Sequence, residues 1–100
     1  MSESDLLAAL GGAAVSFDLA PGVAVELRPL SLPAAGEYHR FREEHPNIED
    51  ALCKLVSLSA YLPGGARLSA ETVVRLPSSV VMKLVDRINE LNGWGEAAGN

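Results

Sequence analysis

Apolar and polar residues alternate in the first third of the chain, over residues 13–19 and again over residues 23–28. A period of two is typical of strands with one buried face. Residues 20–22, Ala-Pro-Gly, separate the two runs and are a turn signal. The pattern predicts a β-hairpin over residues 13–28 with a three-residue loop. Because a lone hairpin is only marginally stable in water, its apolar face is expected to pack on other elements.

After residue 31, apolar positions recur every three to four residues, which predicts helices. Prolines at positions 46, 63 and 77 interrupt this pattern, and each predicted helix follows a residue that can cap its N-terminus. The capping residues are Ser31, Asn47, Ser69 and Ser78. The helices are expected over residues 32–45, 48–62, 70–76 and 79–92, with Gly93 as the C-cap of the last.

The two ends of the chain are less regular. Residues 1–12 are expected to form either a tail or a short helix over residues 4–10, capped by Ser4 and ended by the glycine pair at positions 11 and 12. Residues 94–100 are expected to be a C-terminal tail. The remainder, residues 13–93, predicts one α+β domain in which the N-terminal hairpin packs on a small bundle of three to four helices.

The composition restricts the partners and the location of this domain. The net charge is −5 and the eight basic residues are scattered, so neither nucleic acid nor an anionic membrane surface is an expected ligand. A single cysteine, Cys53, excludes an intrachain disulfide and fits a reducing compartment. The acidic start differs from a secretory signal, and no apolar run approaches the ~18 residues needed to span a membrane. A cytoplasmic protein is expected.

Side chains capable of chemistry are present, but a structural role explains each of them better. His39, Glu43 and His45 share one helical window, yet His45 points to a different side of the helix from Glu43, and a zinc site needs a third converging ligand. Cys53 lies within an apolar helix, as structural thiols do. Residues 93–99 are glycine-rich but lack the spacing and the preceding strand of a phosphate-binding loop. The sequence predicts no catalytic residue, cofactor or metal, and a metal-dependent enzyme remains an alternative hypothesis.

Because no catalytic, cofactor or metal site is expected, the sequence predicts that the protein binds other proteins. The apolar stripes of the helices over residues 48–62 and 79–92 are wide enough to contact a partner, although at least half of their residues must belong to the core. Trp94 is the only tryptophan, and it is either a binding residue or a cap on the core. The residues expected to bind a protein partner are Leu58, Tyr61, Leu62, Val81, Leu84, Val85, Ile88, Leu91 and Trp94.

Three segments together resemble a known family. Residues 27–32 read Leu-Arg-Pro-Leu-Ser-Leu, residues 68–77 end in Leu-Pro, and residues 80–93 space Leu84, Ile88 and Leu91 before a glycine. This order resembles the small tail assembly chaperones of long-tailed bacteriophages and prophages, in which an LRPLT-like segment leads into the first helix and a similar helix closes the domain. The resemblance covers residues 15–95.

The resemblance implies an α+β fold and no enzymatic activity. It also implies binding to the tape measure protein and the tail tube protein during tail assembly in the host cytoplasm, self-association, and absence from the mature virion. A small acidic chaperone or adaptor of a secretion-type or operon-encoded system is the alternative, since it would have the same size, acidity and apolar groove.

Overall fold

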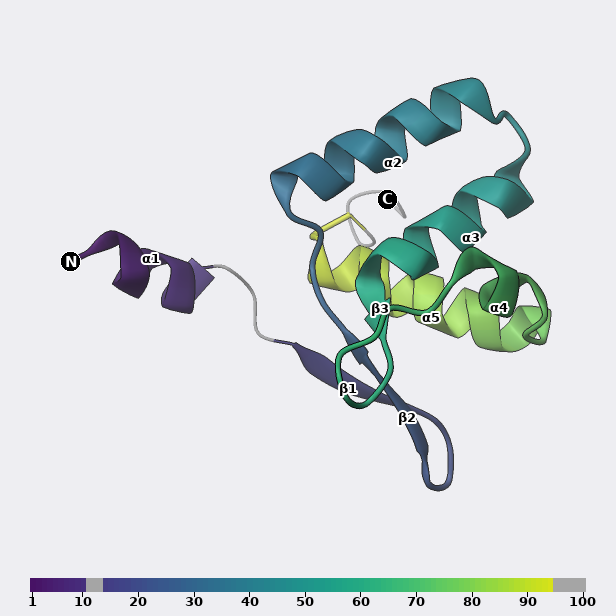
Figure 1. Ribbon diagram of the computed structural model, residues 1–100, viewed down its shortest axis with the longest axis horizontal. Coiled ribbons are helices and arrows are strands. Elements are labelled where there is room, and N and C mark those ends of the chain that lie inside the picture. The colour runs from purple at the N-terminus through teal and green to yellow at the C-terminus, as the bar shows by residue number, and fades with distance from the viewer. Residues whose placement is uncertain (11–13, 95–100) are drawn as a thin grey trace.

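The computed structural model describes residues 1–10 and 14–94. Along the chain these residues form α1 (Glu3–Leu10), β1 (Val15–Ala20), β2 (Val23–Leu27), α2 (Leu32–Glu44), α3 (Ile48–Ser59), β3 (Ala60–Tyr61), α4 (Ala70–Val74) and α5 (Ser78–Leu91). In Figure 1 the hairpin of β1 and β2 projects from a body made of α2 to α5, while α1 stands to one side. The predicted α+β class is confirmed. The expected glycine end of the first helix lies outside the described residues, and so do residues 95–100 of the tail expected over residues 94–100.

The hairpin forms as its alternation predicts. β1 and β2 are antiparallel, with Val15 opposite Leu27 and Phe17 opposite Val25. Burial alternates along β1, and Val25 and Leu27 are buried on the same face. This apolar face joins the main core, which supplies the packing that an isolated hairpin lacks.

The hairpin loop is shorter than predicted. Ala20 pairs with Val23, so only Pro21 and Gly22 remain as a two-residue turn. Gly22 has a φ of 76°, a conformation that glycine adopts without the steric cost of a side chain. The register shifts between Asp18 and Ala20, which places the third residue of the expected loop within the strand instead.

The helix predicted over residues 48–62 ends early, at Ser59, and this part of the prediction is wrong. Ala60 turns to an extended conformation, and β3 pairs antiparallel with β2. The backbone N–H of Arg28 also donates to the carbonyl of Ser59 at 3.0 Å. The apolar stripe continues through Tyr61 without a break, so periodicity alone favours a helix. In the folded chain, however, the open side of β2 lies close enough to form backbone hydrogen bonds with Ala60 and Tyr61, and this pairing is not visible in the local sequence.

The other helix ends differ by one or two residues. α2 ends at Glu44 with His45 as its C-cap. α4 ends at Val74 instead of residue 76, because a proline at position 77 disfavours helical geometry just before it. α5 spans residues 78–91 instead of 79–92.

Three of the predicted N-caps are confirmed. The side chains of Ser31, Asn47 and Ser69 accept hydrogen bonds from the first turns of α2, α3 and α4. Ser78 is not a cap, because Pro77 occupies that position and makes no side-chain bond. Ser4 is not a cap either.

The cap of α1 is Ser2, whose Oγ accepts from the N–H of Asp5 at 3.2 Å, while the Asp5 carboxylate accepts from the N–H of Ser2. This reciprocal pair satisfies two donors at the start of the helix. At the other end of the fold, the C-cap of α5 is Asn92 and not the expected Gly93, which follows it with a φ of 75°. The N–H of Gly93 donates to Glu90 and that of Trp94 to Asn89, the bonding pattern of a Schellman motif.

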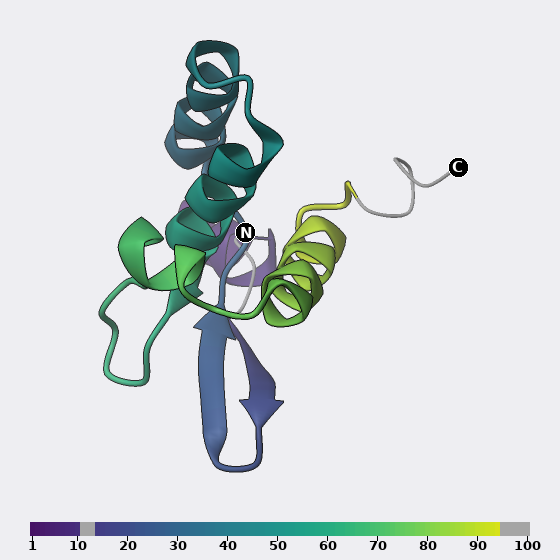
Figure 2. The same ribbon diagram turned by 90° about the vertical axis from the view of Figure 1, so that its right-hand side faces the viewer.

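α3 is the centre of the helical body. It packs against α2, α4 and α5, and Figure 2 shows α4 and α5 on opposite sides of it. The largest fully buried side chains come from β2, α3, α4 and α5, so the hairpin and the helices share one core. These residues are Leu27, Leu55, Val56, Ser59, Val73, Leu84 and Ile88.

Asn92 links the end of α5 to the segment between β2 and α2. Its Oδ1 accepts from the N–H of Leu30 at 2.8 Å, and its Nδ2 donates to the carbonyl of Ile88 at 2.8 Å. We expect Asn92→Ala to lower the free energy of unfolding by about 1–2 kcal/mol, because it leaves a partly buried donor without an acceptor. Urea denaturation measures this change. Asn89→Ala is the matched control on the same helix, and an equal loss in both variants would contradict the role of Asn92.

Ser59 is buried in the core with an exposed fraction of 0%, and its hydroxyl has no hydrogen-bond partner among the described residues. A buried hydroxyl without a partner is destabilising. We therefore expect Ser59→Ala to raise the free energy of unfolding by about 1 kcal/mol. Ser57→Ala serves as the control, since Ser57 Oγ donates to the carbonyl of Lys54 at 3.0 Å. A lower melting temperature for Ser59→Ala would refute this expectation.

Candidate functional site

The residues expected to bind a partner differ widely in exposure. Leu58, Leu84, Val85 and Ile88 are buried, with exposed fractions of 5% or less. Tyr61, Val81, Leu91 and Trp94 are half-buried, and Leu62 is exposed. A buried side chain cannot reach a partner while the fold is intact. The apolar stripe of α5 is therefore largely core.

Trp94 folds back against the body. Its ring stacks on that of Tyr38, with centroids 6.2 Å apart and an interplanar angle of 16°. Tyr38 is a buried residue of α2, so this stack connects α2 to the end of α5. Trp94 thus has a packing role in the free protein, which is the cap on the core that the sequence left as one of two possibilities.

We expect Trp94→Ala to lower the free energy of unfolding by about 2 kcal/mol, because it removes a half-buried aromatic contact. Thermal denaturation followed by circular dichroism measures this. Trp94→Phe keeps an aromatic ring and should retain most of the stability. Unchanged stability of Trp94→Ala, together with weaker partner binding, would instead identify Trp94 as a binding residue.

Tyr61 and Leu62 lie away from this stack, next to the β3 end. The guanidinium of Arg28 lies 4.0 Å above the Tyr61 ring, and Arg67 Nε donates to the Tyr61 hydroxyl at 3.3 Å. The Arg67 guanidinium also lies 5.8 Å from the ring centroid, so both cations are close to the ring. Of Tyr61 and Leu62, only Leu62 presents an apolar side chain to solvent, with 42% of its surface exposed.

An accessible apolar surface of the helical body lies between α3, α4 and the first half of α5. A hollow of about 260 Å³ opens there. Its walls are mostly apolar and come from all three helices and the segment between α4 and α5. They include Leu52, Val73, Leu76, Val81 and Met82. Val81 is the only one of the nine expected partner-binding residues that lines it.

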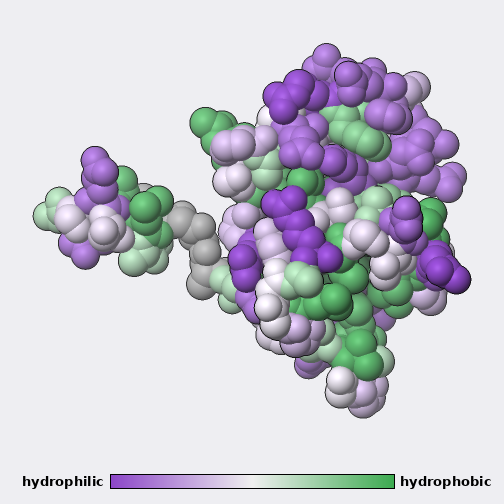
Figure 3. Space-filling view, viewed as in Figure 1, coloured by the Kyte–Doolittle hydropathy of each residue, from purple (hydrophilic) through white to green (hydrophobic). Residues whose placement is uncertain are grey.

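A second hollow, of about 510 Å³, adjoins the first, and both are lined by Cys53 and Val74. It is bounded by the C-terminal end of α2, the outer side of α3 and the start of α4. Its lining includes Phe41, His45, Ser57 and Ala70. We call the two hollows together the α3–α4 groove. Figure 3 shows mostly hydrophilic side chains over α2 and a mixture of hydrophobic and hydrophilic ones beneath it.

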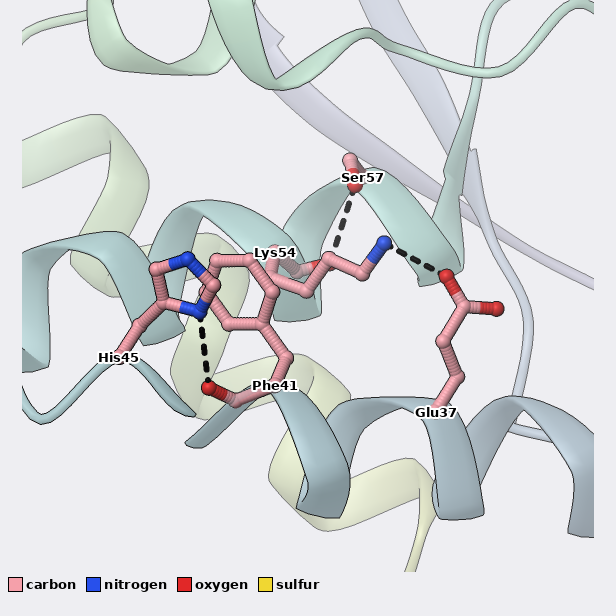
Figure 4. A network of polar contacts seen from close by, with 5 residues as sticks. All are labelled: Glu37, Phe41, His45, Lys54 and Ser57. Carbon is pink, nitrogen blue, oxygen red and sulfur yellow. Dashed lines mark hydrogen bonds and ion pairs between the residues drawn. The ribbon is translucent and has the colours of Figure 1, made fainter. Parts of the chain in front are cut away.

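The α2 side of the groove is held in place by the contacts in Figure 4. Lys54 Nζ lies 2.6 Å from Glu37 Oε2 and joins α3 to α2. The His45 ring stacks on Phe41 with centroids 4.0 Å apart, and His45 Nδ1 lies 3.2 Å from the Phe41 carbonyl. These contacts fix the apolar wall that Phe41 provides.

The Lys54 ammonium lowers the pKa of Glu37, first through its hydrogen bond and then through its charge. A carboxyl whose pKa is lower in the folded chain stabilises it at neutral pH, and this contribution disappears as the pH falls through the titration of the carboxyl. Both side chains are partly exposed, so the effect on stability is small. The positive charge of Lys54 is nevertheless neutralised at the groove.

Three carboxylates stand at the groove, those of Glu49, Asp50 and Glu71. None of them forms an ion pair with another residue in the described part of the chain. Glu49 and Asp50 lie in the first turn of α3, where they complement the positive end of the helix. With Lys54 already paired, the groove presents an apolar floor with a negative rim.

The groove contains little that favours catalysis. Burial, followed by the charges of Asp50 and Glu49, raises the pKa of the Cys53 thiol, which is opposite to the shift that activates a nucleophile. His39 lies beside Tyr38 and Trp94, whereas His45 lies on Phe41. Across residues 1–10 and 14–94, no three His, Cys, Asp or Glu side chains are placed to hold a metal ion.

The residues at the centre of the groove were missed by the sequence prediction. Val74 is 69% exposed and Met82 is 44% exposed. Neither belongs to the stripes that the periodicity selects. The adjacent valines at positions 73 and 74 carried a usable signal, since a five-residue helix cannot turn both toward the core. Only the fold shows that Val74 and Met82 line the same hollow.

No helix within the described ranges is both long enough and apolar enough to cross a membrane. Comparison of the chain with protein-family models, with curated proteins and with solved structures finds no match. The function is therefore inferred from the groove and from the resemblance of the three sequence segments.

Proposed function

We propose that this protein is a tail assembly chaperone that holds a helical segment of an unassembled phage tail protein in the α3–α4 groove. The partners are the tape measure protein and the tail tube protein. The chaperone acts in the cytoplasm of the host bacterium, associates with itself, and is absent from the finished virion. The observation that carries this proposal is the open apolar groove with three unpaired carboxylates at its rim.

The groove suits an amphipathic helix. Such a helix presents apolar side chains at positions i, i+3 or i+4, and i+7, which enter neighbouring hollows of a receptor. Two adjoining hollows that share Val74 can accept successive side chains of this kind. A long helical protein that is still unassembled exposes this pattern repeatedly, and covering it keeps the chain soluble.

The negative rim adds a preference for charge. Glu49, Asp50 and Glu71 favour a helix whose apolar stripe is flanked by lysine or arginine. Exposed charge pairs of this kind contribute less to affinity than to the rate and orientation of encounter. We therefore expect the apolar contacts to determine the affinity, and added salt to slow association.

The same groove would serve the alternative, a small acidic chaperone or adaptor of a secretion-type or operon-encoded system. The two proposals differ in the partner and not in the mode of binding. The identity of the protein that the groove protects therefore separates them.

Co-expression with the tape measure protein encoded nearby tests the proposal. We expect the wild-type chain to raise the soluble fraction of the tape measure protein and to co-purify with it. Leu32→Gln is the matched control, because Leu32 is an exposed leucine outside the groove and its replacement should change neither result. A folded wild-type chain that neither co-purifies with a tail protein nor increases its solubility would rule the proposal out. Binding to a secretion substrate instead would favour the alternative.

A further inference from the structure

β1 is an edge strand with one open side. The sheet order is β1-β2-β3, so β1 pairs with β2 on one side, and no described strand pairs with the other. Figures 1 and 2 show the hairpin projecting from the helices. An edge of this kind presents unpaired backbone N–H and C=O groups to any strand that can align with it.

The sequence of β1 fits a second copy of itself. In an antiparallel arrangement centred on Ser16, each Val15 lies opposite a Phe17, and each Asp18 lies opposite an Ala14. Aliphatic–aromatic pairs across strands are favourable, and no two like charges face each other in this register. Val15 and Phe17 are half-buried on one face, while Ser16 and Asp18 are exposed on the other, so the two faces also match.

The neighbouring registers fit less well. Centring the pair on Phe17 places Val15 opposite Leu19, where the strand is irregular because its register with β2 shifts between Asp18 and Ala20. Centring it on Asp18 brings the two Asp18 carboxylates together, which is unfavourable. The arrangement centred on Ser16 avoids the irregular part of the strand and pairs Val15, Ser16 and Phe17 of β1 with one another, while Ala14 lies just before the strand.

The segment before β1 also leaves apolar side chains exposed to solvent in a single chain. Residues 1–9 are all exposed, including Leu6 and Leu7 of α1, which are 46% and 70% exposed. Exposed leucines of this kind are also able to contact a second chain. A two-fold symmetric contact uses the same surface patch on both copies. The β1 strand meets this requirement, because it can pair with an antiparallel copy of itself.

We propose that two copies of this chain pair through their β1 strands, antiparallel and centred on Ser16, to form one sheet of six strands. This proposal assigns the surface of self-association. It depends on neither the α3–α4 groove nor the identity of any tail protein.

Disulfide trapping tests the proposed register. Ser16→Cys is introduced into a Cys53→Ala background, since Cys53 is the only native cysteine. Directly opposed residues of an antiparallel pair have Cα atoms about 4.5–5.5 Å apart, within the range of a disulfide. We expect mild oxidation to convert most of the protein to a covalent dimer that is reversed by reductant.

Glu26→Cys in the same background is the matched control. Glu26 lies opposite Ser16 on β2 and on the same face of the sheet, but in the proposed dimer the two copies of it are three strand spacings, about 14 Å, apart. This variant should form no covalent dimer under the same oxidation. Equal cross-linking of both variants would indicate random collision and would overturn the proposal.

Light scattering of the wild-type chain provides a test without any substitution. We expect a mass of two chains of 10.5 kDa at micromolar concentrations. A monomer at every concentration, or a β1 edge occupied only by a strand of another protein, would overturn the proposal. Loss of tape measure binding with an intact dimer would instead reject the proposed function alone.

Discussion

Leu84→Ala is expected to lower the free energy of unfolding by about 3 kcal/mol. Leu84 is completely buried in the middle of α5 and belongs to the core shared by the hairpin and the helices. Truncating a buried leucine removes favourable burial and leaves a cavity, which together cost about 2–5 kcal/mol. For a domain of this size, a loss of 3 kcal/mol lowers the melting temperature by roughly 15 °C. Urea denaturation with an unchanged slope measures the loss directly.

Met82→Ala is the control for this experiment. Met82 lies two residues earlier on the same helix but is 44% exposed, so its truncation should change the stability by less than about 1 kcal/mol. The comparison also decides the role of the α5 stripe. If Leu84→Ala left the stability unchanged and removed partner binding, α5 would be a docking surface and the packing described here would be wrong.

The order of elements follows from local signals in the sequence. The alternation around Phe17 produces a strand because only one face of the hairpin meets the core. Ser31, Asn47 and Ser69 start helices because their side chains accept from donors that the first turn leaves free. Alternation and capping both act between residues a few positions apart, so they can be recognised in the sequence.

The structural features that could not be predicted from the sequence depend on contacts between segments that are far apart in the chain. β3 exists because Ala60 and Tyr61 come to lie beside β2, more than thirty positions away in the chain. Asn92 carries no signal of its own, yet it accepts from Leu30, 62 positions away. Both require the helices to be in place before the contact can form.

The candidate site, too, could be predicted from the sequence only in part. An apolar stripe marks residues that leave water, but it does not say whether they enter the core or meet a partner. The stripe of α5 packs against α3 and belongs to the core that the hairpin shares, so most of it is buried in the folded chain. The surface that stays open contains Val74 and Met82, which interrupt the regular pattern of α4 and α5.

Replacing both Val74 and Met82 with glutamine is expected to weaken binding of the tape measure protein on the order of 100-fold. Removing each apolar contact from the groove is expected to cost about 1–1.5 kcal/mol, and 1.4 kcal/mol corresponds to a factor of ten in the dissociation constant. Both side chains are exposed in the free protein, so the melting temperature should change by only a few degrees. Titration calorimetry with a helical segment of the tape measure protein measures the affinity.

The substitutions keep the net charge at −5, so a loss of affinity in this variant cannot arise from electrostatics. Leu32→Gln makes a similar change at a residue that is 87% exposed and lies outside the groove, and it should bind as tightly as the wild type. Equal affinity of the groove variant and the wild type would move the binding site elsewhere on the molecule. Equal losses in both variants would mean that the partner recognises exposed apolar surface in general. Only a loss confined to Val74 and Met82 ties recognition to the surface that the fold leaves open.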